Sequence, residues 1–224
     1  MKLIENIITI DGPSGVGKGT LAFSLAKKLG WNVLDSGLIY RLIGYLSLRK
    51  ELETSKEIVS LINKSKIQLL TNFKDSVCEI ELNDNVLGEE LRNEKIASRA
   101  SEIAKDEEIR KAIIKIQRNT YDAKKGLIAD GRDMGTIIFP EAALKVFLKA
   151  SPEVRAKRRA NQLKEKGMDV IMHDLLELIQ LRDKEDMQRK ISPLKPADDS
   201  LILDTSDLSI QEVEEKVMEN FKKL

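Results

Sequence analysis

One glycine-rich segment constrains the fold of this chain more than any other feature: Gly12-Pro13-Ser14-Gly15-Val16-Gly17-Lys18-Gly19-Thr20. It follows a short apolar run that ends at Ile10, and it opens a helical apolar stripe that stops before Gly30. A strand, a glycine loop and a helix in this order form a P-loop. The glycines let several backbone N–H groups converge on a phosphate, and the helix adds the positive end of its dipole. We therefore expect an α/β nucleotide-binding protein.

The lysine and the threonine of this segment have separate expected roles. Lys18 adds a full positive charge between the β- and γ-phosphates of a nucleotide. Thr20 is placed to contact a magnesium ion or its water shell. The usual P-loop carries Ser or Thr directly after the lysine, whereas this chain has Gly19 there and the threonine one position later. This Gly-Lys-Gly-Thr order resembles that of the nucleoside monophosphate kinases.

Size and charge balance narrow the choice of partners. The 224 residues suffice for one α/β domain with a small insertion. Lys and Arg number 38 against 37 Asp and Glu, so we expect neither a nucleic-acid nor a membrane partner. The single cysteine, Cys78, excludes an intrachain disulfide and a cysteine-based zinc site. Without a signal-peptide pattern or an apolar run of about 18 residues, the chain is expected to be cytoplasmic.

Short apolar runs alternate with helical patterns along most of the chain. The predicted strands are Ile7 to Ile10, Asn32 to Leu34, Leu127 to Ala129, Leu144 to Leu148 and Ser200 to Leu203. The spacing of Ile109, Ile113 and Ile116 predicts a buried helical stripe. Strands separated by helices indicate a parallel sheet that is covered on both faces. The predicted fold is therefore a P-loop core with a parallel five-stranded sheet flanked by helices.

Three segments depart from this rhythm. Polar and apolar residues alternate over 78–82, and a turn at 83–85 precedes the apolar pair 86–87, which predicts an antiparallel β insertion over about 62–91. The charged segment 150–166 has few large apolar residues and predicts an exposed helix or lid. The C-terminal segment 209–224 predicts a charged amphipathic helix, with Ser209 and Glu212 forming a capping box.

A polar segment after the second predicted strand is a candidate acceptor site. The carboxyl ends of parallel strands meet at one edge of the sheet, so this segment should lie beside the P-loop. Ser36 can hydrogen-bond a phosphate or a base, Tyr40 can stack on a base, and Arg41 can clamp an acceptor phosphate. The alternative is a capped helix start with a surface tyrosine and arginine.

The run Asp130-Gly131-Arg132-Asp133-Met134 follows the third predicted strand and is more specific. Asp130 lies where P-loop enzymes keep a carboxylate for the magnesium shell. Arg132 can reach a phosphate, and Asp133 can accept hydrogen bonds from a sugar or a base. A polar turn is the alternative, although a turn does not need two acids around an arginine.

Two arginine clusters have helical spacing. Arg155, Arg158 and Arg159 share one predicted face with few acids nearby, which favours a mobile lid that brings charge to the transition state over a merely solvated face. Arg182, Asp186 and Arg189 share another face, where Asp186 is expected to hold the two guanidinium groups apart. The alternative for the second cluster is a pair of exposed salt bridges.

Several other residues look structural. Taken alone, Ser101 and Arg110 are expected on the surface, with Arg110 beside the apolar stripe of its helix. His173, Cys78 and Trp31 lack any partner pattern that demands catalysis, and we interpret them as structural or packing residues.

Together these motifs resemble those of the bacterial-type cytidylate kinases almost from end to end. The landmarks are the P-loop with Ile10 and Asp11, the segments 35–41, 129–136 and 150–159, and Arg182-Asp183-Lys184-Glu185-Asp186. The resemblance implies magnesium-dependent phosphoryl transfer from ATP to CMP or dCMP in a protein that is expected to be monomeric. The β insertion also fits, because this family has an enlarged acceptor-binding domain.

The resemblance further implies a role for each candidate residue. The P-loop residues 12–20 would hold the ATP phosphates, and the metal would lie against Thr20 and Asp130, the latter through water. The acceptor would lie among Ser36, Tyr40, Arg41, Ser101, Arg110, Arg132, Asp133, Arg182 and Asp186, of which Ser101, Asp133, Arg182 and Asp186 would read the cytosine or the sugar. The catalytic group would comprise Lys18, Arg132, Arg155, Arg158, Arg159 and Arg189.

We expect a single kinase unit with three regions. Residues 1–35, 100–150 and 190–224 would form the P-loop core, 36–99 the acceptor-binding region, and 150–189 the lid and the helix after it. The β insertion and acceptor selectivity are the parts least fixed by motifs.

Three other functions share some of these features. A nucleotide switch should carry Asn-Lys-x-Asp, but the nearest string is Asn63-Lys64-Ser65-Lys66. A kinase for AMP or UMP is closer, although the adenylate-like pattern Asp-Gly-Phe-Pro-Arg is absent at residues 130–134. A nucleic-acid-dependent ATPase would need a stacking platform, and the chain has only 5 Phe, 3 Tyr and 1 Trp.

Overall fold

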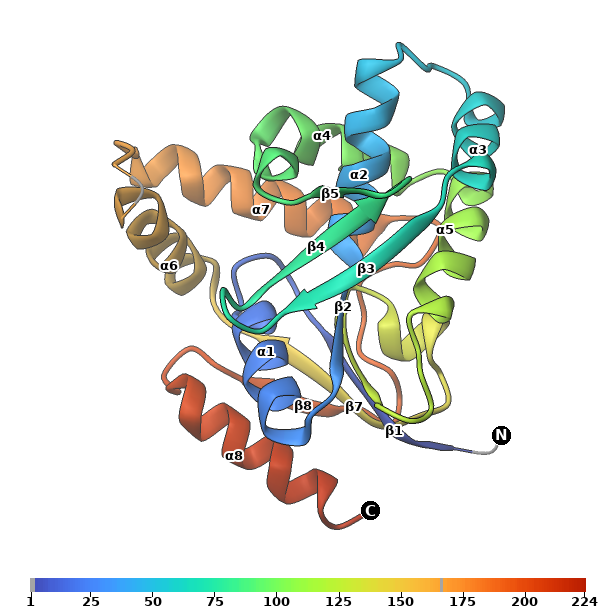
Figure 1. The fold of residues 1–224 in the computed structure, drawn as a ribbon. Helices are drawn as coiled ribbons and strands as arrows, with labels where there is room; N and C mark the ends of the chain where they lie inside the picture. Colours follow the sequence, from blue (N-terminus) through green and yellow to red (C-terminus); the bar gives the residue numbers. More distant parts are fainter. Residues whose placement is uncertain (1–2, 166) are drawn as a thin grey trace.

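A computed structural model describes residues 3–165 and 167–224 (Figure 1). Residues 1–2, at the start of the predicted core, and 166, the last residue of the predicted lid segment, lie outside the described residues. The main sheet is parallel, with the strand order β2-β6-β1-β7-β8. Its strands are β1 (Ile4–Asp11), β2 (Asn32–Asp35), β6 (Leu127–Gly131), β7 (Ala142–Lys149) and β8 (Leu201–Asp204). All five predicted strands are confirmed, and so is the predicted fold class.

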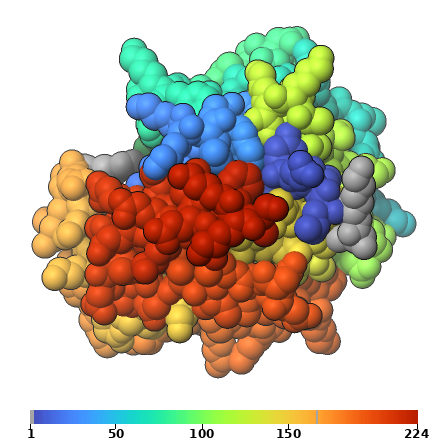
Figure 2. All heavy atoms as spheres, turned by 90° about the horizontal axis from the view of Figure 1, so that it is seen from below, coloured from blue at the N-terminus to red at the C-terminus, as the bar shows by residue number. Residues whose placement is uncertain are grey.

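Helices cover both faces of this sheet, as is usual for parallel sheets, whose strands are connected by helices. On one face α1 (Lys18–Leu29) and α8 (Ile210–Phe221) pack against each other, and Figure 2 shows α8 lying across this side of the molecule. On the other face α2 (Ser36–Arg49), α5 (Glu107–Asn119) and a short π-helical turn (Met134–Ile138) lie near β6 and β1. The predicted capping box of α8 between Ser209 and Glu212 is present.

The register of the sheet brings the polar ends of the strands to one edge. Ile10 lies beside Asp130 on β6, and Asp130 lies beside Asp35 on β2. The P-loop leaves this edge from β1, and the segment after Gly131 leaves it from β6. The sheet therefore delivers both polar motifs to the same place, as expected for parallel strands.

A second, antiparallel sheet is inserted between β2 and β6, as predicted. Its order is β3-β4-β5, with β3 (Ile67–Asn72), β4 (Val77–Leu82) and β5 (Asn85–Leu87). The neighbouring helices are α3 (Ser55–Lys64), a 3-10 turn (Glu89–Arg92) and α4 (Glu94–Ile103). Buried side chains of β4, Cys78 and Ile80, belong to the main hydrophobic core, so this sheet packs onto the core.

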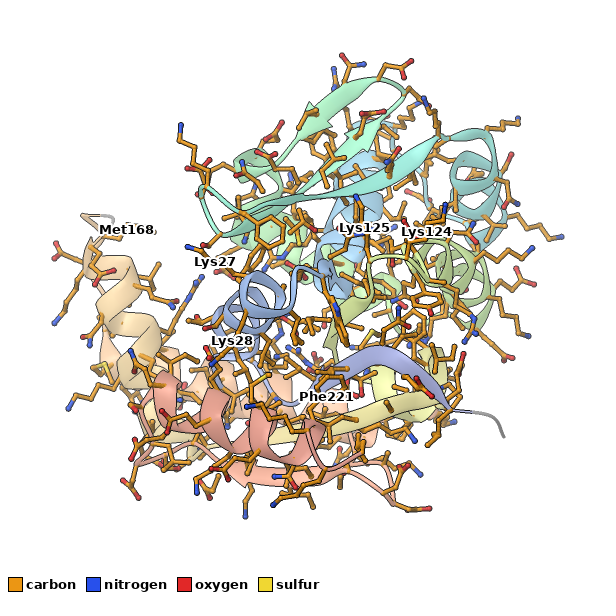
Figure 3. The ribbon with its side chains drawn as sticks, turned by 60° about the horizontal axis from the view of Figure 1, so that its bottom comes forward. Lys27, Lys28, Lys124, Lys125, Met168 and Phe221 are labelled. Carbon is orange, nitrogen blue, oxygen red and sulfur yellow. The ribbon has the colours of Figure 1, made fainter. Side chains whose placement is uncertain are left out.

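The described part of the predicted lid segment, 150–165, forms the first helix of a helical hairpin. Its helices are α6 (Pro152–Glu165) and α7 (Met172–Gln188). Ala156, Ala160, Leu175 and Ile179 form a small apolar core of their own between the two helices. Met168, labelled in Figure 3, lies at the tip of this hairpin. Among the helices of the described residues, none combines the length and apolar composition needed to cross a bilayer.

Residues predicted to be structural take three different positions. Trp31 packs edge-on against Phe221 of α8, with ring centroids 5.5 Å apart, and Cys78 is buried. His173 is exposed and lies 3.3 Å from Glu177 one turn along α7. Packing therefore explains the first two residues but not the histidine.

Candidate active site

The P-loop is held in its curved shape by contacts that only glycine allows. Gly12 has a φ of +150°, and a Cβ at this position would lie 2.3 Å from the carbonyl oxygen of Leu148 on β7. Gly17 has a φ of +99° and directly precedes α1. The loop therefore packs against β7 and then directs the N-terminus of α1 towards the cavity above the loop, where an anion would be favoured.

Lys18 is buried beneath this loop. Its Nζ donates a hydrogen bond to the carbonyl of Pro13 at 3.0 Å and lies 3.9 Å from Oδ1 of Asp130. Burial, aided by Arg132, lowers the pKa of Lys18 to about 8. Burial also raises the pKa of Asp130 to about 6, although the charge of Lys18 opposes this shift. Burial thus shifts both pKa values towards the neutral forms, and pKa shifts of this kind cluster at functional sites.

A cavity of about 590 Å³ opens over the P-loop. Residues 15–20 form its floor, and Arg158, Thr205 and Leu208 contribute to its walls. Arg158 donates to the Thr205 hydroxyl at 3.2 Å, and this hydroxyl lies 3.3 Å from the carbonyl oxygen of Val16. Thr205 and Leu208 were not predicted as site residues. Their position just after β8 could have indicated them, because ligands bind beyond the carboxyl ends of parallel strands.

All nine predicted acceptor residues line a second, smaller cavity of about 90 Å³. Arg189, predicted as a catalytic arginine, lines it too. These residues come from α2, α4, α5, α7 and the segment after β6. The structure therefore brings together side chains that are up to about 150 residues apart in the sequence.

Asp186 organises the arginines of this cavity, but not as predicted. It pairs with Arg132 at 2.9 Å and lies 3.7 Å from Arg189. Within the described residues, no ion pair joins it to Arg182, the predicted partner. α7 ends at Gln188, so Arg189 lies just outside the helix, and Arg132 approaches Asp186 from the segment after β6. Burial opposes ionisation of Asp186, but Arg132 and Arg189 outweigh it and lower its pKa.

Arg110 is buried, so the expectation that it lies on the surface is wrong. It forms an ion pair with Asp133 and donates to the carbonyl of Ala104 at 3.1 Å. Its guanidinium carbon also lies 5.5 Å from the ring centroid of Tyr40. The buried stripe of α5 is wider than the three isoleucines suggested, and tertiary partners satisfy the charge there.

Two α2 residues of the acceptor cavity have partners within the protein. The Ser36 hydroxyl accepts a hydrogen bond from Gln117 at 2.8 Å. Arg41 donates to the backbone carbonyl of Leu91 at 3.2 Å, so it connects α2 to the turn after the inserted sheet. Ser101 is half-buried on α4. The alternative of a surface tyrosine and arginine at the start of α2 does not hold, because Tyr40 is buried and Arg41 is half-buried.

The three lid arginines have different environments. Arg155 is 2% exposed and makes a two-pronged ion pair with Asp183 of α7, with one N–O distance of 2.9 Å. It also donates to the carbonyl of Ser14 in the P-loop at 3.2 Å. Arg159 pairs with Glu94 of α4 at 3.1 Å near the surface. The expectation that acids are scarce around this cluster is therefore wrong, because the acids come from other helices.

A third cavity, of about 340 Å³, connects the two sites. It is lined by Ser14 and Gly15 of the P-loop and by Arg41 and Arg182 of the acceptor cavity, and Arg159 also faces it. The phosphate-binding loop and the acceptor arginines thus border one continuous region. This arrangement allows two anions to approach each other.

Asp11 joins the loops that carry the two sites. It is the last residue of β1, and its carboxylate accepts hydrogen bonds from the backbone N–H groups of Met134 at 2.9 Å and Gly135 at 2.8 Å. Burial raises its pKa to about 7, against the effect of these two hydrogen bonds. Met134 and Gly135 come directly after Asp133, which lines the acceptor cavity. Asp11 therefore connects the end of β1 with that cavity.

The site has few side chains that could bind a metal ion directly. The described residues contain no cluster of three or more His, Cys, Asp or Glu side chains that could hold a metal. Thr20 faces the cavity over the P-loop, and the carboxylate of Asp130 lies beside Lys18. One hydroxyl and one carboxylate suit Mg²⁺, which usually keeps several waters and binds substrate phosphates.

Comparison with known proteins identifies the family of this chain. The family described as cytidylate kinase matches residues 8–223. A cytidylate kinase from Shewanella denitrificans is 45% identical over 218 residues, covering 96% of each chain. One from Pseudomonas syringae pv. tomato is 46% identical over 220 residues, covering 97% of this chain and 96% of the relative.

A likeness among solved structures concerns the fold alone. An uncharacterized protein from Eubacterium ventriosum has a TM-score of 0.52 and 13% identity, and the match covers 98% of this chain and 99% of that chain. The family itself is shown by the match over nearly the whole chain and by the two relatives. This protein belongs to the cytidylate kinase family.

Proposed function

We propose that this protein transfers the γ-phosphoryl group of ATP in line to CMP or dCMP, giving ADP and CDP or dCDP. The observation that carries the proposal is the meeting of two anion sites at one sheet edge, in a member of the cytidylate kinase family. One site is a backbone cradle with Lys18, and the other is a cluster of arginines. A kinase for a phosphorylated acceptor needs both.

The reaction needs no general base from the protein. The second pKa of a phosphate monoester is near 6, by analogy with phosphorylated side chains, so the acceptor oxygen is already anionic near neutral pH. The protein must instead align two anions and neutralise the charge between them. Arginines and a lysine suit this task. Arg41, Arg159 and Arg182 border the cavity between the two sites, and Lys18 lies in the P-loop cavity.

We assign the predicted residues to two groups. The P-loop backbone and Lys18 hold the ATP phosphates, and Thr20 and Asp130 hold Mg²⁺, with Asp130 acting through water. This ion supplies positive charge to the β- and γ-phosphates when it is bound. The acceptor lies in the cavity of Arg41, Arg110, Arg132 and Ser36, with Tyr40 against its wall.

The remaining candidates would give selectivity and closure. We propose that Ser101, Asp133, Arg182 and Asp186 read the cytosine and the sugar. Arg155, Arg158, Arg159 and Arg189 would bring charge towards the transferred group, with 36–99 as the acceptor region and 150–189 as the lid. The acceptor cavity of about 90 Å³ is smaller than ordinary ligand sites, which supports the idea that these regions separate to admit the nucleotide. We also propose that the enzyme is a cytoplasmic monomer.

The test is a coupled assay of ADP release with ATP and Mg²⁺, offering CMP, dCMP, UMP, AMP and GMP separately. We expect fast turnover with CMP and dCMP, weaker turnover with UMP and none with the purines. If AMP is the best acceptor, the P-loop assignments stand and the acceptor assignments are wrong. If no monophosphate stimulates ADP release, the kinase proposal fails, and slow GTP hydrolysis would then support a nucleotide switch.

A further inference from the structure

A buried amide lies behind the acceptor cavity. Gln117 of α5 is fully buried, and its Nε2 donates a hydrogen bond to the hydroxyl oxygen of Ser36 at 2.8 Å. Ser36 lines the acceptor cavity, whereas Gln117 is not among the lining residues. Gln117 therefore acts on any bound acceptor only through Ser36.

The direction of this hydrogen bond decides what Ser36 can offer to a ligand. A serine hydroxyl has one hydrogen to donate and two lone pairs that accept. An amide NH₂ group can only donate, so Gln117 occupies a lone pair of Ser36 and leaves the hydroxyl hydrogen for the cavity. A phosphate near neutral pH can only accept, so this is the polarity that a phosphate requires.

Only one of the two polar atoms of the Gln117 amide has a partner in the part of the chain that the structure describes. Within the described residues, Oε1 of Gln117 has no hydrogen-bond partner. A buried polar atom without a partner is unfavourable, and a methionine or leucine of similar size would avoid this. The amide at this core position therefore makes its side-chain hydrogen bond through Nε2, the atom that contacts Ser36.

The contact belongs to an ordered interface between two helices. Ser36 and Tyr40 are one turn apart on α2, and Arg110 and Gln117 are two turns apart on one face of α5. Arg110 lies over the ring of Tyr40, while Gln117 meets Ser36. Ser36 is also the first residue of α2, where the helix dipole favours an anion.

We propose that Gln117 is a positioning residue that fixes the Ser36 hydroxyl as a hydrogen-bond donor to the acceptor phosphate. This inference rests on the proposed function, because it takes CMP as the occupant of the cavity. Gln117 orients the hydroxyl and does not itself touch the substrate. Loss of its NH₂ group should weaken binding of CMP and leave binding of ATP unchanged.

The experiment compares Gln117→Met with the wild type by calorimetric titration of CMP and of ATP, alongside steady-state kinetics. We expect the Kd of CMP to rise roughly 3- to 10-fold, the range of one ordinary hydrogen bond, with kcat and the Kd of ATP near wild type. Gln68→Met, at an exposed position on β3, is the matched control and should change neither constant. Gln117→Leu repeats the test with a second apolar side chain.

Two further variants separate positioning from packing. Gln117→Glu presents a carboxylate that would accept the Ser36 hydrogen, so it should weaken CMP more than Gln117→Met does. In a Ser36→Ala background, Gln117→Met should have no further effect on the Kd of CMP, because the hydroxyl that it positions is gone. An equal loss in both backgrounds would show a packing role and overturn the inference.

The outcomes also separate this inference from the proposed function. If the wild type does not phosphorylate CMP, the proposed function itself fails. If the wild type is active but Gln117→Met and Gln117→Leu bind CMP with the wild-type Kd, only the positioning role fails.

Discussion

The two halves of the candidate site are built in opposite ways. The donor half is made mainly of backbone: a curved loop, the N-terminus of α1 and one buried lysine, under a cavity of about 590 Å³. The acceptor half is made of side chains from four helices and one loop, and its charged groups already pair with one another. The phosphate loop of the donor half is encoded by nine consecutive residues, whereas the acceptor half comes together only once the chain has folded.

This contrast indicates where each half is vulnerable. A backbone cradle tolerates the loss of most single side chains, so its activity should depend on very few of them. A network of paired charges distributes its function, but removing one partner leaves the other buried and unpaired. The following predictions test this contrast, beginning with the largest effect.

The ion pair that joins α6 to α7 should have the largest effect on stability. Asp183→Ala leaves the guanidinium of Arg155 buried without its partner, and we expect a loss of about 3–5 kcal/mol in the free energy of unfolding. Glu94→Gln breaks the exposed pair between α4 and Arg159, which lies on α6 like Arg155. This change should lower the free energy of unfolding by less than about 1 kcal/mol. Urea denaturation measures both, and similar values for the two variants would contradict this account.

Lys18→Ala should have the largest effect on chemistry. Its ammonium group lies beneath the phosphate loop, so its loss should lower kcat by roughly 10²- to 10³-fold, as for other groups that stabilise transition-state charge. The folded state should persist by circular dichroism. Lys27→Ala, at the opposite end of α1 and labelled in Figure 3, is the matched control. A kcat within a few-fold of wild type would remove Lys18 from the site.

Arg132→Ala should mainly damage handling of the acceptor. The variant loses a charged hydrogen-bond donor and leaves Asp186 with only the longer contact to Arg189. We expect the KM for CMP to rise roughly 10- to 100-fold, with a much smaller change in the KM for ATP. Arg49→Ala, an exposed arginine of α2, should change neither constant. Equal increases for both substrates would mean that the two halves are not separable at this residue.

Asp11 should show a smaller effect that depends on pH. Its pKa is raised from an ordinary value of 3.8 to about 7 by burial, so between these values the folded protein holds a proton that the unfolded chain does not. Its contribution to stability is therefore full below about pH 4 and falls as pH rises to 7. Lys18, Asp133 and Arg132 are charged groups that act on it.

The measurement is the free energy of unfolding of wild type and Asp11→Asn from pH 4.5 to 7.5. The difference between the two proteins should change in this direction by up to about 1.4 kcal/mol per pH unit, the limit for one proton. A constant difference across this range would show that Asp11 does not titrate there. Asp11 would then be an anion that simply tethers Met134 and Gly135.

The donor half could be predicted from the sequence better than the contacts of the acceptor half. The P-loop, the five strands and the inserted sheet could be predicted because each depends on neighbours in the chain. The burial of Arg110 could not, since its charge is compensated by Asp133 from the distant segment after β6. Asp186 pairs with Arg132, where the sequence had predicted Arg182, and this contact also depends on packing between elements. Gln117 carried a readable signal, because it lies two turns from Arg110 on one helix face.

The strand order has a consequence for how the chain is made. The central strand β1 pairs only with β6 and β7, and Ile7 meets Leu127, about 120 residues later. At a synthesis rate of 5–20 residues per second, β1 must wait roughly 6–24 s for its first neighbour. During that interval an apolar strand has both edges open, which is the condition that favours aggregation. The inserted β3-β4-β5 sheet pairs strands adjacent in sequence, so on the ribosome the acceptor region can form its sheet before the donor region has one.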